Sequence, residues 1–291
     1  NQIMKIALGT VQFGMRYGVA NRADRVPLTE VKDILEQSAA VGIDTLDTAI
    51  AYGDSEAVLG EIGVDRWHVV TKLPTLPDGV SDVTAWVATQ IEASLNRLGV
   101  SRLYGVLLHR PDQLLGNNGK SLIYALQHIK ELGYTEKIGI SAYCPDEIDN
   151  LASACSLDLV QAPLNILDRR LITSGCASRL KDRGIELHVR SIFLQGLLLM
   201  PEGSYPEKFQ RWSPLWAHWH QWLRDSSLDA VQACLAYVMA AEEVDRVVVG
   251  VDSVAHLNEI LMASHSSLAT FPDFEHLVDV ALLNPSCWSQ L

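Results

Sequence analysis

Polar side chains of four chemical types lie at or just beyond the ends of short apolar runs. Asp47, Lys72 and His109 each end such a run, and Tyr52 lies five residues after the first of them. If the runs are neighbouring parallel strands, a carboxylate, an ammonium, an imidazole and a phenol converge at one end of a sheet. Such a set suits proton delivery to a carbonyl oxygen, because carbonyl reduction needs a hydride at carbon and a proton at oxygen.

Each of these side chains has a distinct expected role. A free phenol, with a pKa of about 10, donates poorly unless its phenolate is stabilised. We expect Lys72 beside the Tyr52 oxygen to lower that pKa, and Asp47 to keep Lys72 protonated and oriented. A neutral His109 would donate one N–H to the carbonyl oxygen. Taken singly, an Asp at a strand end is often a helix cap and a lone His is often packed in the core, so only the combination is specific.

The elements that must position these residues follow from strand-length apolar runs that alternate with amphipathic helical segments. The predicted strands are 5–8, 43–47, 67–72, 103–109, 137–141, 157–162, 186–191 and 246–249. The predicted helices are 29–41, 55–60, 82–98, 121–132, 145–154, 174–183, 228–241 and 254–264. Repeated strand and helix units predict an α/β protein, a closed (β/α)8 TIM barrel, which needs roughly 250 residues.

The ends of the predicted helices carry recognisable signals. Thr29 and Asp82 are predicted N-caps, and a glycine follows several helices at the C′ position, at Gly42, Gly99, Gly133 and Gly184. A doubly wound open sheet is the alternative fold. That fold usually has a Gly-x-Gly-x-x-Gly turn after its first strand, whereas residues 9–14 read Gly-Thr-Val-Gln-Phe-Gly.

Two segments lie outside the repeat, at about 198–227 and about 271–291. We therefore predict a single barrel domain over 1–291, with an inserted segment and a C-terminal extension. The inserted segment holds tryptophans at helical spacing, Trp212, Trp216, Trp219 and Trp222, which favour packing against the barrel over a lid. We expect no metal site at His218 and His220, because side chains two positions apart on a helix point in different directions. Trp288 is expected to reach the mouth of the barrel.

Composition excludes several functional classes. With 291 residues, 48% hydrophobic content and a formal net charge of -12, the chain lacks the clustered Lys and Arg that nucleic acid or an anionic membrane requires. The amino terminus has no signal-peptide layout, and no apolar run approaches the roughly 20 residues of a membrane span. The five cysteines form no Cys-x-x-Cys pair and are expected to be reduced. We expect a cytoplasmic protein, and a monomer is one expected state.

Asp47, Tyr52, Lys72 and His109 belong to longer motifs that resemble one family. Asp47-Thr48-Ala49, then Tyr52-Gly53 and Ser55-Glu56, then Thr71-Lys72, then Leu108-His109-Arg110-Pro111 resemble the aldo-keto reductases in order and spacing, over almost the whole chain. The resemblance implies a (β/α)8 barrel with a nicotinamide dinucleotide extended across its mouth. It also implies Tyr52 as general acid, Lys72 and Asp47 as the residues that tune it, and His109 as the residue that orients the carbonyl.

The resemblance further implies a set of dinucleotide-binding residues. These are Gly9, Thr10, Val11, Asp47, Ser141, Gln161, Arg190, Ser191, Phe193, Gln195, Gly196, Gly250, Asp252, Ser253 and His256. Two positions depart from the family pattern. Ala142 replaces an Asn that helps to hold the nicotinamide carboxamide, and Arg190 replaces an aromatic residue that stacks on the nicotinamide. A planar guanidinium can also stack, so binding is still expected.

A third departure concerns the choice between NAD(H) and NADP(H). Family members that use NADPH typically carry Lys or Arg two residues after the glycine numbered 250 here, and another Arg soon after, whereas this chain has Asp252, Ser253 and His256. A carboxylate repels the 2′-phosphate of NADPH and accepts a hydrogen bond from the free ribose hydroxyl of NADH. We expect NAD(H) to be accepted at least as well as NADP(H), against the family default.

Three functions are considered. The leading one is an NAD(P)(H)-dependent oxidoreductase that reduces an aldehyde or ketone. Its substrate would be sugar-derived, because the stretches 8–14, 17–21 and 189–196 resemble a bacterial branch linked with sugar and surface-polysaccharide metabolism. The second is a non-catalytic nicotinamide-binding regulatory subunit. The third is a barrel enzyme that forms a Schiff base at Lys72, which would need a phosphate-binding Gly-rich loop where only Gly196 and Gly250 occur.

Overall fold

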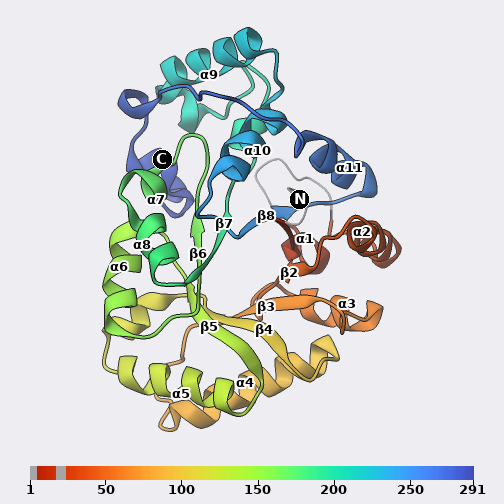
Figure 1. The fold of residues 1–291 in the computed structure, drawn as a ribbon, viewed down its shortest axis with the longest axis vertical. Coiled ribbons are helices and arrows are strands. Elements are labelled where there is room, and N and C mark those ends of the chain that lie inside the picture. Colours follow the sequence, from red (N-terminus) through yellow and green to blue (C-terminus); the bar gives the residue numbers. More distant parts are fainter. Residues whose placement is uncertain (1–4, 18–23) are drawn as a thin grey trace.

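The chain folds into a closed barrel of parallel strands in chain order, as predicted. The computed structural model describes residues 5–17 and 24–291, so the amino-terminal residues 1–4, and all but Tyr17 of the family-like stretch 17–21, lie outside the described residues. The strands are β1 Ile6–Gly9, β2 Thr45–Asp47, β3 His68–Leu73, β4 Leu103–Leu108, β5 Thr135–Ser141, β6 Leu159–Pro163, β7 Glu186–Arg190 and β8 Arg246–Gly250. Figure 1 shows helices arranged around this barrel.

The barrel closes because β1 pairs in parallel with β8 as well as with β2. Gly9 lies opposite Gly250 on one side and Asp47 on the other. Most strand residues are buried, because the helices cover the outside and side chains fill the inside. This double burial explains why continuous apolar runs, rather than alternating ones, predicted the strands.

Helices follow the strands as the repeat predicted. The α-helices are α1 Val11–Gly14, α2 Leu28–Ala40, α3 Ser55–Ile62, α4 Val83–Leu98, α5 Gly119–Glu131, α6 Pro145–Ala154, α7 Arg170–Thr173, α8 Cys176–Asp182, α9 Ser213–Ser226, α10 Ala230–Ala240, α11 Val254–Ala263 and α12 Val280–Leu283. Short 3₁₀ turns are η2 Pro111–Leu115, η3 Leu197–Leu199, η4 Glu207–Trp212, η5 Glu275–Leu277 and η6 Pro285–Gln290. The short helices α1, α7 and α12 were not predicted.

The bounds of the predicted helices differ from the observed ones by at most two residues, and most of the predicted end signals are found. The Asp82 side chain accepts a hydrogen bond from the Ala85 N–H and caps α4. The predicted N-cap at Thr29 is wrong, because the N-cap is Pro27, two residues earlier, and its carbonyl accepts the Val31 N–H. Residues 42, 99, 133 and 184 are glycines with positive φ, as a C′ position requires.

The segments outside the repeat form a second apolar cluster beside the barrel core. Trp216 and Trp219 of α9 are buried there, and their indole N–H groups donate to the carbonyls of Phe209 and Leu198. The C-terminal segment joins the same cluster through Trp288, whose ring centre is 4.8 Å from that of Phe209. Figure 1 shows α9 at the top of the view with the blue C-terminal segment beside it. The tryptophan stripe therefore packs, as the favoured interpretation held.

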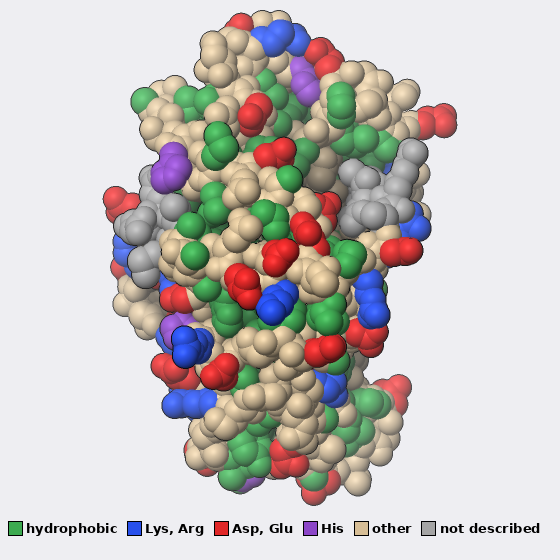
Figure 2. Space-filling view, turned by 90° about the vertical axis from the view of Figure 1, so that its right-hand side faces the viewer, with side chains coloured by type: hydrophobic (Ala, Val, Ile, Leu, Met, Phe, Trp, Pro, Cys, Tyr) green, Lys and Arg blue, Asp and Glu red, His purple; other side chains and the backbone are tan. Residues whose placement is uncertain are grey.

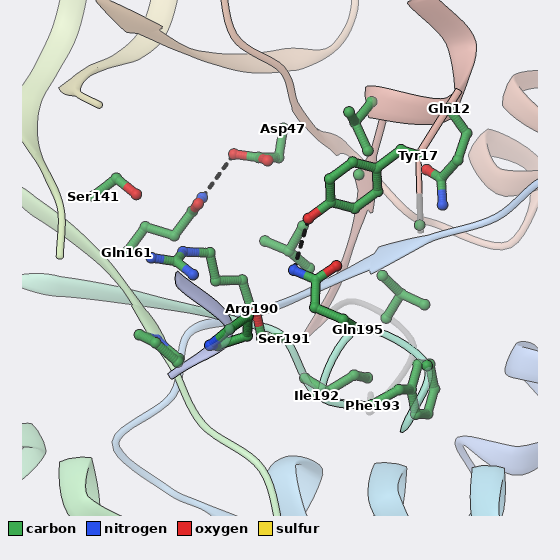
Figure 3. A pocket seen from close by; sticks show the side chains of 18 of the residues that line it. Gln12, Tyr17, Asp47, Ser141, Gln161, Arg190, Ser191, Ile192, Phe193 and Gln195 are labelled. Atoms are coloured by element: carbon green, nitrogen blue, oxygen red, sulfur yellow. Dashed lines mark hydrogen bonds between the residues drawn. The ribbon is translucent and has the colours of Figure 1, made fainter. Parts of the chain in front are cut away.

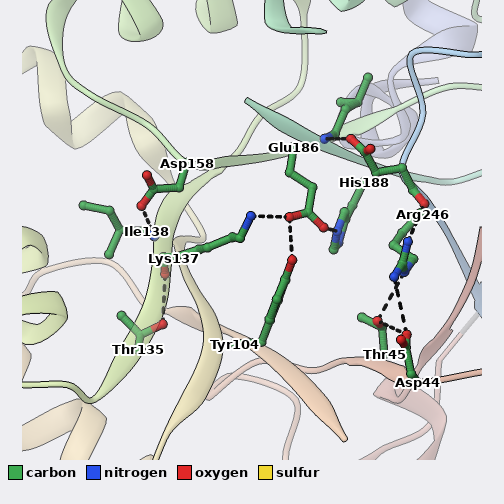
Figure 4. Close-up of polar contacts among 12 residues, drawn as sticks. Asp44, Thr45, Tyr104, Thr135, Lys137, Ile138, Asp158, Glu186, His188 and Arg246 are labelled. Atoms are coloured by element: carbon green, nitrogen blue, oxygen red, sulfur yellow. Dashed lines mark hydrogen bonds and ion pairs between the residues drawn. The ribbon is translucent and has the colours of Figure 1, made fainter. Parts of the chain in front are cut away.

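The end of the barrel where the strands begin is closed by polar contacts. Glu186 of β7 accepts a hydrogen bond from Tyr104 at 2.6 Å, an ion-pair contact from Lys137 at 2.7 Å and one from His188 at 2.9 Å. Figure 4 shows these three side chains converging on Glu186. Because they come from β4, β5 and β7, one carboxylate ties together three strands at this end of the barrel.

The surface is acidic and mixed. Figure 2 shows acidic side chains spread over one face, with Lys and Arg side chains interspersed among them rather than gathered in one patch. No described helix is long and apolar enough to cross a membrane. All five cysteines are free thiols.

Candidate active site

The carboxyl ends of the strands, at the end of the barrel opposite Glu186, surround a cavity of about 650 Å³. Nearly all the predicted site residues line it, although they are far apart in the sequence. They are Gly9, Thr10, Val11, Asp47, Tyr52, Lys72, His109, Ser141, Gln161, Arg190, Ser191, Phe193, Gln195, Gly196, Gly250, Asp252 and His256. Figure 3 shows part of this set facing the opening.

Lys72 lies at the centre of the polar contacts in the cavity. Its ammonium donates to both carboxylate oxygens of Asp47, at 2.8 and 2.9 Å, and to the Thr48 carbonyl at 2.9 Å. The Tyr52 hydroxyl is 3.4 Å from the same nitrogen. The Lys72 side chain is only 1% exposed. Burial lowers the pKa of Lys72, but Asp47 and Tyr52 outweigh it and hold the pKa above its ordinary value. Lys72 is therefore a fixed cation.

Tyr52 has a pKa above its ordinary value of 10. Burial raises the pKa, the Lys72 ammonium lowers it, and the Asp47 carboxylate raises it again. Lys72 thus acts in the expected direction, but the predicted net lowering is wrong, since loss of hydration outweighs the single cation. The phenol is consequently protonated at neutral pH. When it gives up its proton, the phenolate is stabilised by the Lys72 ammonium beside it.

His109 faces Tyr52 across the cavity. The two ring centres are 5.9 Å apart and the planes are nearly perpendicular, at 83°. Burial lowers the pKa of His109 to about 4, and the positive charges of Lys72, Arg110 and Arg190 contribute in the same direction. The imidazole is therefore neutral at neutral pH, as expected for a group that donates one N–H without carrying charge.

The loop that carries Tyr52 is held by hydroxyl contacts and one glycine. Ser55 contacts the hydroxyl of Thr10 at 2.7 Å and that of Thr48 at 3.0 Å. A Cβ at Gly14 would lie 2.2 Å from the Tyr52 carbonyl oxygen, so only glycine lets α1 approach this loop. The motif residue Ser55 thus joins the ends of β1 and β2 below the phenol.

Two buried amide oxygens in the cavity have no hydrogen-bond partner among the described residues. They are Oε1 of Gln12 and Oε1 of Gln161. Gln161 is oriented by its own amide, which donates to Asp47 at 2.6 Å, as Figure 3 shows. A buried acceptor without a donor is costly, so each of these oxygens fits a donor group of a bound molecule.

Beyond β7 the chain makes a turn with unusual backbone geometry. Ser191, Leu194 and Gln195 have positive φ values of 56°, 50° and 57° although none is glycine. The Gln195 amide donates to the Tyr17 hydroxyl at 2.7 Å and so crosses the opening to the region after β1 (Figure 3). Strained backbone of this kind gathers at ligand sites more than elsewhere.

The region after β8 differs in part from the prediction. Asp252 and His256 line the cavity, and the Asp252 carboxylate is 3.2 Å from Nδ1 of His256. Ser253 is not among the lining residues, because its hydroxyl accepts the His256 N–H and caps α11. The segment after β8 therefore contributes one carboxylate, Asp252, to the cavity lining.

Several lining residues were not predicted. Arg110 and Tyr143 each lie two residues after a strand end. The same signal that indicated His109 and Ser141, a polar residue at the end of an apolar run, could therefore have indicated them. Residues 283–286 line the cavity from the C-terminal segment, whereas Trp288 does not reach it. The expectation for Trp288 is wrong, because its ring is buried against Phe209 instead.

No group of His, Cys, Asp and Glu side chains able to hold a metal ion occurs in the ranges 5–17 and 24–291. Of the two histidines considered above, His220 contacts the Tyr205 hydroxyl at 2.7 Å, and the His218 ring packs edge-on to Phe274. Both side chains therefore have contacts of their own within the second apolar cluster.

Comparison with known proteins defines the class. The sequence model of the Aldo/keto reductase family matches residues 5–273, so the chain belongs to this family of oxidoreductases. Solved aldo-keto reductases share the fold: one from Bacillus halodurans aligns with a TM-score of 0.70 at 20% identity, over 97% of this chain and 95% of that one. A glycerol dehydrogenase from Gluconobacter oxydans aligns with a TM-score of 0.73 at 20% identity, over 91% and 88%.

Curated relatives are more similar in sequence but over shorter stretches. An uncharacterized oxidoreductase of Mycobacterium tuberculosis is 31% identical over 49% of this chain and 43% of its own length. A 6-dehydroglucose reductase of Agrobacterium fabrum is 30% identical over 62% of this chain and 66% of its own length. The matched part of the chain thus spans less than two thirds of these relatives.

Proposed function

We propose that this protein reduces an aldehyde or ketone to an alcohol, with Tyr52 as the proton donor and NAD(H) or NADP(H) as the cofactor. The observation that carries the proposal is the buried contact of one ammonium, Lys72, with both the Asp47 carboxylate and the Tyr52 hydroxyl. Aldo-keto reductases generally use a nicotinamide dinucleotide and act on small carbonyl compounds. The cavity of about 650 Å³ also has room for a substrate of that size.

The proton transfer follows from the charges around Tyr52. At neutral pH the phenol holds its proton, because burial raises its pKa. When that proton moves to the carbonyl oxygen, the negative charge on the phenol develops beside the Lys72 ammonium, which Asp47 keeps charged. Neutral His109 donates an N–H to the same carbonyl oxygen and fixes its direction.

The lining fits a nicotinamide dinucleotide, which supplies the hydride when bound. Ser141 and the partner-free Oε1 of Gln161 would receive the nicotinamide carboxamide. Gly9, Thr10 and Val11 at the end of β1 lie on the opposite side of the opening. The strained turn after β7 would bind the pyrophosphate, through Ser191, Phe193, Gln195 and Gly196, and Arg190 would stack on the nicotinamide.

The adenosine ribose would lie against the end of β8, beyond Gly250. There the lining offers the Asp252 carboxylate, paired with His256, and no Lys or Arg from residues 250–256. We propose that NADH binds at least as tightly as NADPH, because the carboxylate repels a 2′-phosphate. Dissociation constants of the two dinucleotides, from quenching of protein fluorescence, test this, and a strong preference for NADPH would contradict it.

The proton-donor role is tested by Tyr52→Phe, which removes only the hydroxyl. We expect kcat/KM for carbonyl reduction to fall by about 10² to 10⁴, while the dinucleotide dissociation constant stays within about twofold. Tyr124→Phe is the matched control, because Tyr124 is 64% exposed on α5 and lies outside the cavity lining. Undiminished reduction by the Tyr52 variant would refute the role.

The same assays separate the alternatives. A regulatory nicotinamide-binding subunit would bind dinucleotide without turnover. A Schiff-base enzyme would be trapped by borohydride at Lys72, but an ammonium with a raised pKa, engaged with Asp47, is a poor nucleophile. For the substrate, the similarity to a 6-dehydroglucose reductase supports a sugar-derived carbonyl compound.

A further inference from the structure

One side of the cavity opening gathers positive side chains that the proposed proton transfer does not use. Arg110 follows His109 after β4, Arg170 is the first residue of α7, and Arg190 is the last residue of β7. All three line the cavity together with Tyr143, which comes from the region after β5. These elements are consecutive around the barrel, so the cations share one sector of the opening.

Two of the guanidinium groups are arranged around one aromatic ring. The Arg190 guanidinium carbon is 4.8 Å from the centre of the Tyr143 ring, and that of Arg110 is 5.5 Å from it. Arg190 also donates to the Ala142 carbonyl at 2.8 Å. Contact with the ring and the carbonyl positions these planar groups without neutralising their charge.

The charge balance of this sector is positive. Arg170 is neutralised by Asp168, which accepts two hydrogen bonds from it at 2.8 and 2.9 Å. In the part of the chain that the structure describes, Arg110 and Arg190 have no such carboxylate partner within 4.0 Å. Two unpaired guanidinium groups at one opening stand out in a chain whose formal net charge is -12.

The positive charges of Arg110 and Arg190 also affect the neighbouring His109 imidazole. Burial lowers the pKa of His109 to about 4, and Lys72, Arg110 and Arg190 each lower it as well. In the proposed reaction the carbonyl oxygen lies against His109. The charges of Arg110 and Arg190 therefore act at the place where the substrate would sit, while the Asp47 carboxylate acts in the opposite direction.

We propose that the substrate carries an anionic group, a carboxylate or a phosphate, which Arg110 binds while the carbonyl lies against Tyr52 and His109. Arg190, whose planar face is assigned to the nicotinamide, adds a second positive charge beside the same group. This inference rests on the proposed reductase function and specifies its substrate class. Guanidinium groups present paired N–H donors that match carboxylate and phosphate oxygens. Because Arg110 and His109 line the same cavity, one small substrate can present its carbonyl to His109 and its anionic group to Arg110.

Pairs of substrates that differ in charge test the inference. Succinic semialdehyde against butanal tests a carboxylate, and glyceraldehyde 3-phosphate against glyceraldehyde tests a phosphate. A hydrogen bond to a charged group contributes about 1.5–3 kcal/mol, so we expect kcat/KM to favour the anionic member of at least one pair by about 10- to 100-fold. The pair with the larger ratio identifies which anion is bound.

The variant Arg110→Gln should remove most of this preference by raising KM for the anionic member. Its matched control is Arg102→Gln, which makes the same charge change at an exposed residue just before β4, at the opposite end of the same strand. The control should keep the wild-type ratio. The preference should also weaken as ionic strength rises, since partly exposed charges are screened.

The outcomes separate this inference from the proposed function. Equal kcat/KM for both members of both pairs overturns the anion site and leaves the reductase intact. An Arg110→Gln variant that weakens NADH binding but keeps the substrate preference also overturns it, since Arg110 would then serve the dinucleotide. No reduction of any of the four carbonyl compounds overturns the proposed function and this inference with it.

Discussion

At the scale of single residues, the site depends on one buried cation. The Lys72 ammonium is surrounded by the Asp47 carboxylate, the Thr48 carbonyl and the Tyr52 hydroxyl, with almost no exposure to solvent. A buried charge is costly unless it is paired and hydrogen-bonded. The Lys72 and Asp47 charges therefore stabilise each other in the buried site. The same ion pair places a fixed cation beside the Tyr52 phenol.

This pairing predicts that stability and activity can be separated. Lys72→Met should destabilise the protein by about 3–5 kcal/mol, because it leaves the Asp47 carboxylate buried and unpaired. The double variant with Asp47→Asn should recover most of that loss, because no buried charge remains. Both variants should lose about 10²-fold or more in kcat/KM, because neither has a cation beside Tyr52. Urea unfolding and steady-state kinetics measure the two quantities.

A double variant as unstable as Lys72→Met would mean that the unpaired Asp47 carboxylate is not what destabilises the Lys72 variant. Recovery of activity in the double variant would mean that the Tyr52 proton needs no neighbouring cation. Gln161 donates to the same carboxylate oxygen and stays in place in both variants, so it does not confound the comparison.

The residue types of the site could be predicted, but not their energetics. Tyr52, Lys72 and His109 follow from polar residues placed after apolar runs. The net upward shift of the Tyr52 pKa could not be predicted, because burial of its side chain depends on loops far away in the sequence. The pattern did not single out Arg110, which lines the cavity, because the adjacent His109 already accounts for a polar residue at that strand end.

At the scale of elements, the turn after β7 serves two environments at once. Leu194 and Leu197 point into the second apolar cluster, while Ser191 and Gln195 line the cavity. Over these few residues the chain alternates between the two environments, and Ser191, Leu194 and Gln195 have positive φ. Such geometry costs of order 1 kcal/mol for each residue, and the buried leucines maintain it.

The strain at Ser191 allows its hydroxyl to be tested without unfolding the turn. Ser191→Gly keeps the backbone conformation, which glycine adopts freely, so stability should change by less than about 1 kcal/mol. If the hydroxyl binds the pyrophosphate, the dinucleotide dissociation constant should rise by about tenfold. Ser227→Gly is the matched control, since Ser227 has φ of 57° but lies at the exposed end of α9. Equal dinucleotide affinity in the Ser191 variant and the control would exclude this role.

The elements themselves were predictable for a physical reason. Buried parallel strands need continuous apolar runs, and the helices between them need one apolar face, so the sequence carries both periods over the whole barrel. The misplaced N-cap at Thr29 shows the limit of this reasoning, because Pro27 provides a carbonyl that starts α2 earlier. The left-handed turn after β7 has no glycine signal at residues 191, 194 and 195, so the pattern could not reveal it.

At the scale of the whole molecule, the two ends of the barrel are specialised. The ends where strands finish hold the cavity and its unpaired cations. The ends where strands begin are closed by Glu186 and its contacts, together with Arg246, which contacts Asp44 and Thr45 of the β2 region (Figure 4). This division predicts that changes at the Glu186 end affect stability and leave the chemistry unchanged.

Glu186→Gln tests that division. Burial raises the pKa of Glu186, but hydrogen bonds from His188, Lys137 and Tyr104 outweigh it and hold the pKa well below its usual range. The carboxylate therefore stabilises the fold fully above the unfolded-state value near 4.5, and this contribution is lost as pH falls below it. At pH 7 the variant should lose about 3 kcal/mol, which corresponds to roughly 6–12 °C in Tm, because a buried charge network loses its centre.

The pH dependence distinguishes this loss from a simple packing defect. The stability difference between wild type and Glu186→Gln should stay constant from pH 7 down to about 4.5 and then shrink as pH falls further. Below the unfolded-state value the unfolded wild type binds a proton that the folded form does not, and this lowers the stability of the wild type only. Glu242→Gln is the control, since Glu242 is 89% exposed and its nearest Lys181 contact is 4.0 Å, so its stability should change by less than about 1 kcal/mol. Carbonyl reduction per folded molecule should equal that of wild type at pH 7. A variant that kept its stability deficit at low pH, or lost activity while folded, would show that the two ends of the barrel are not independent.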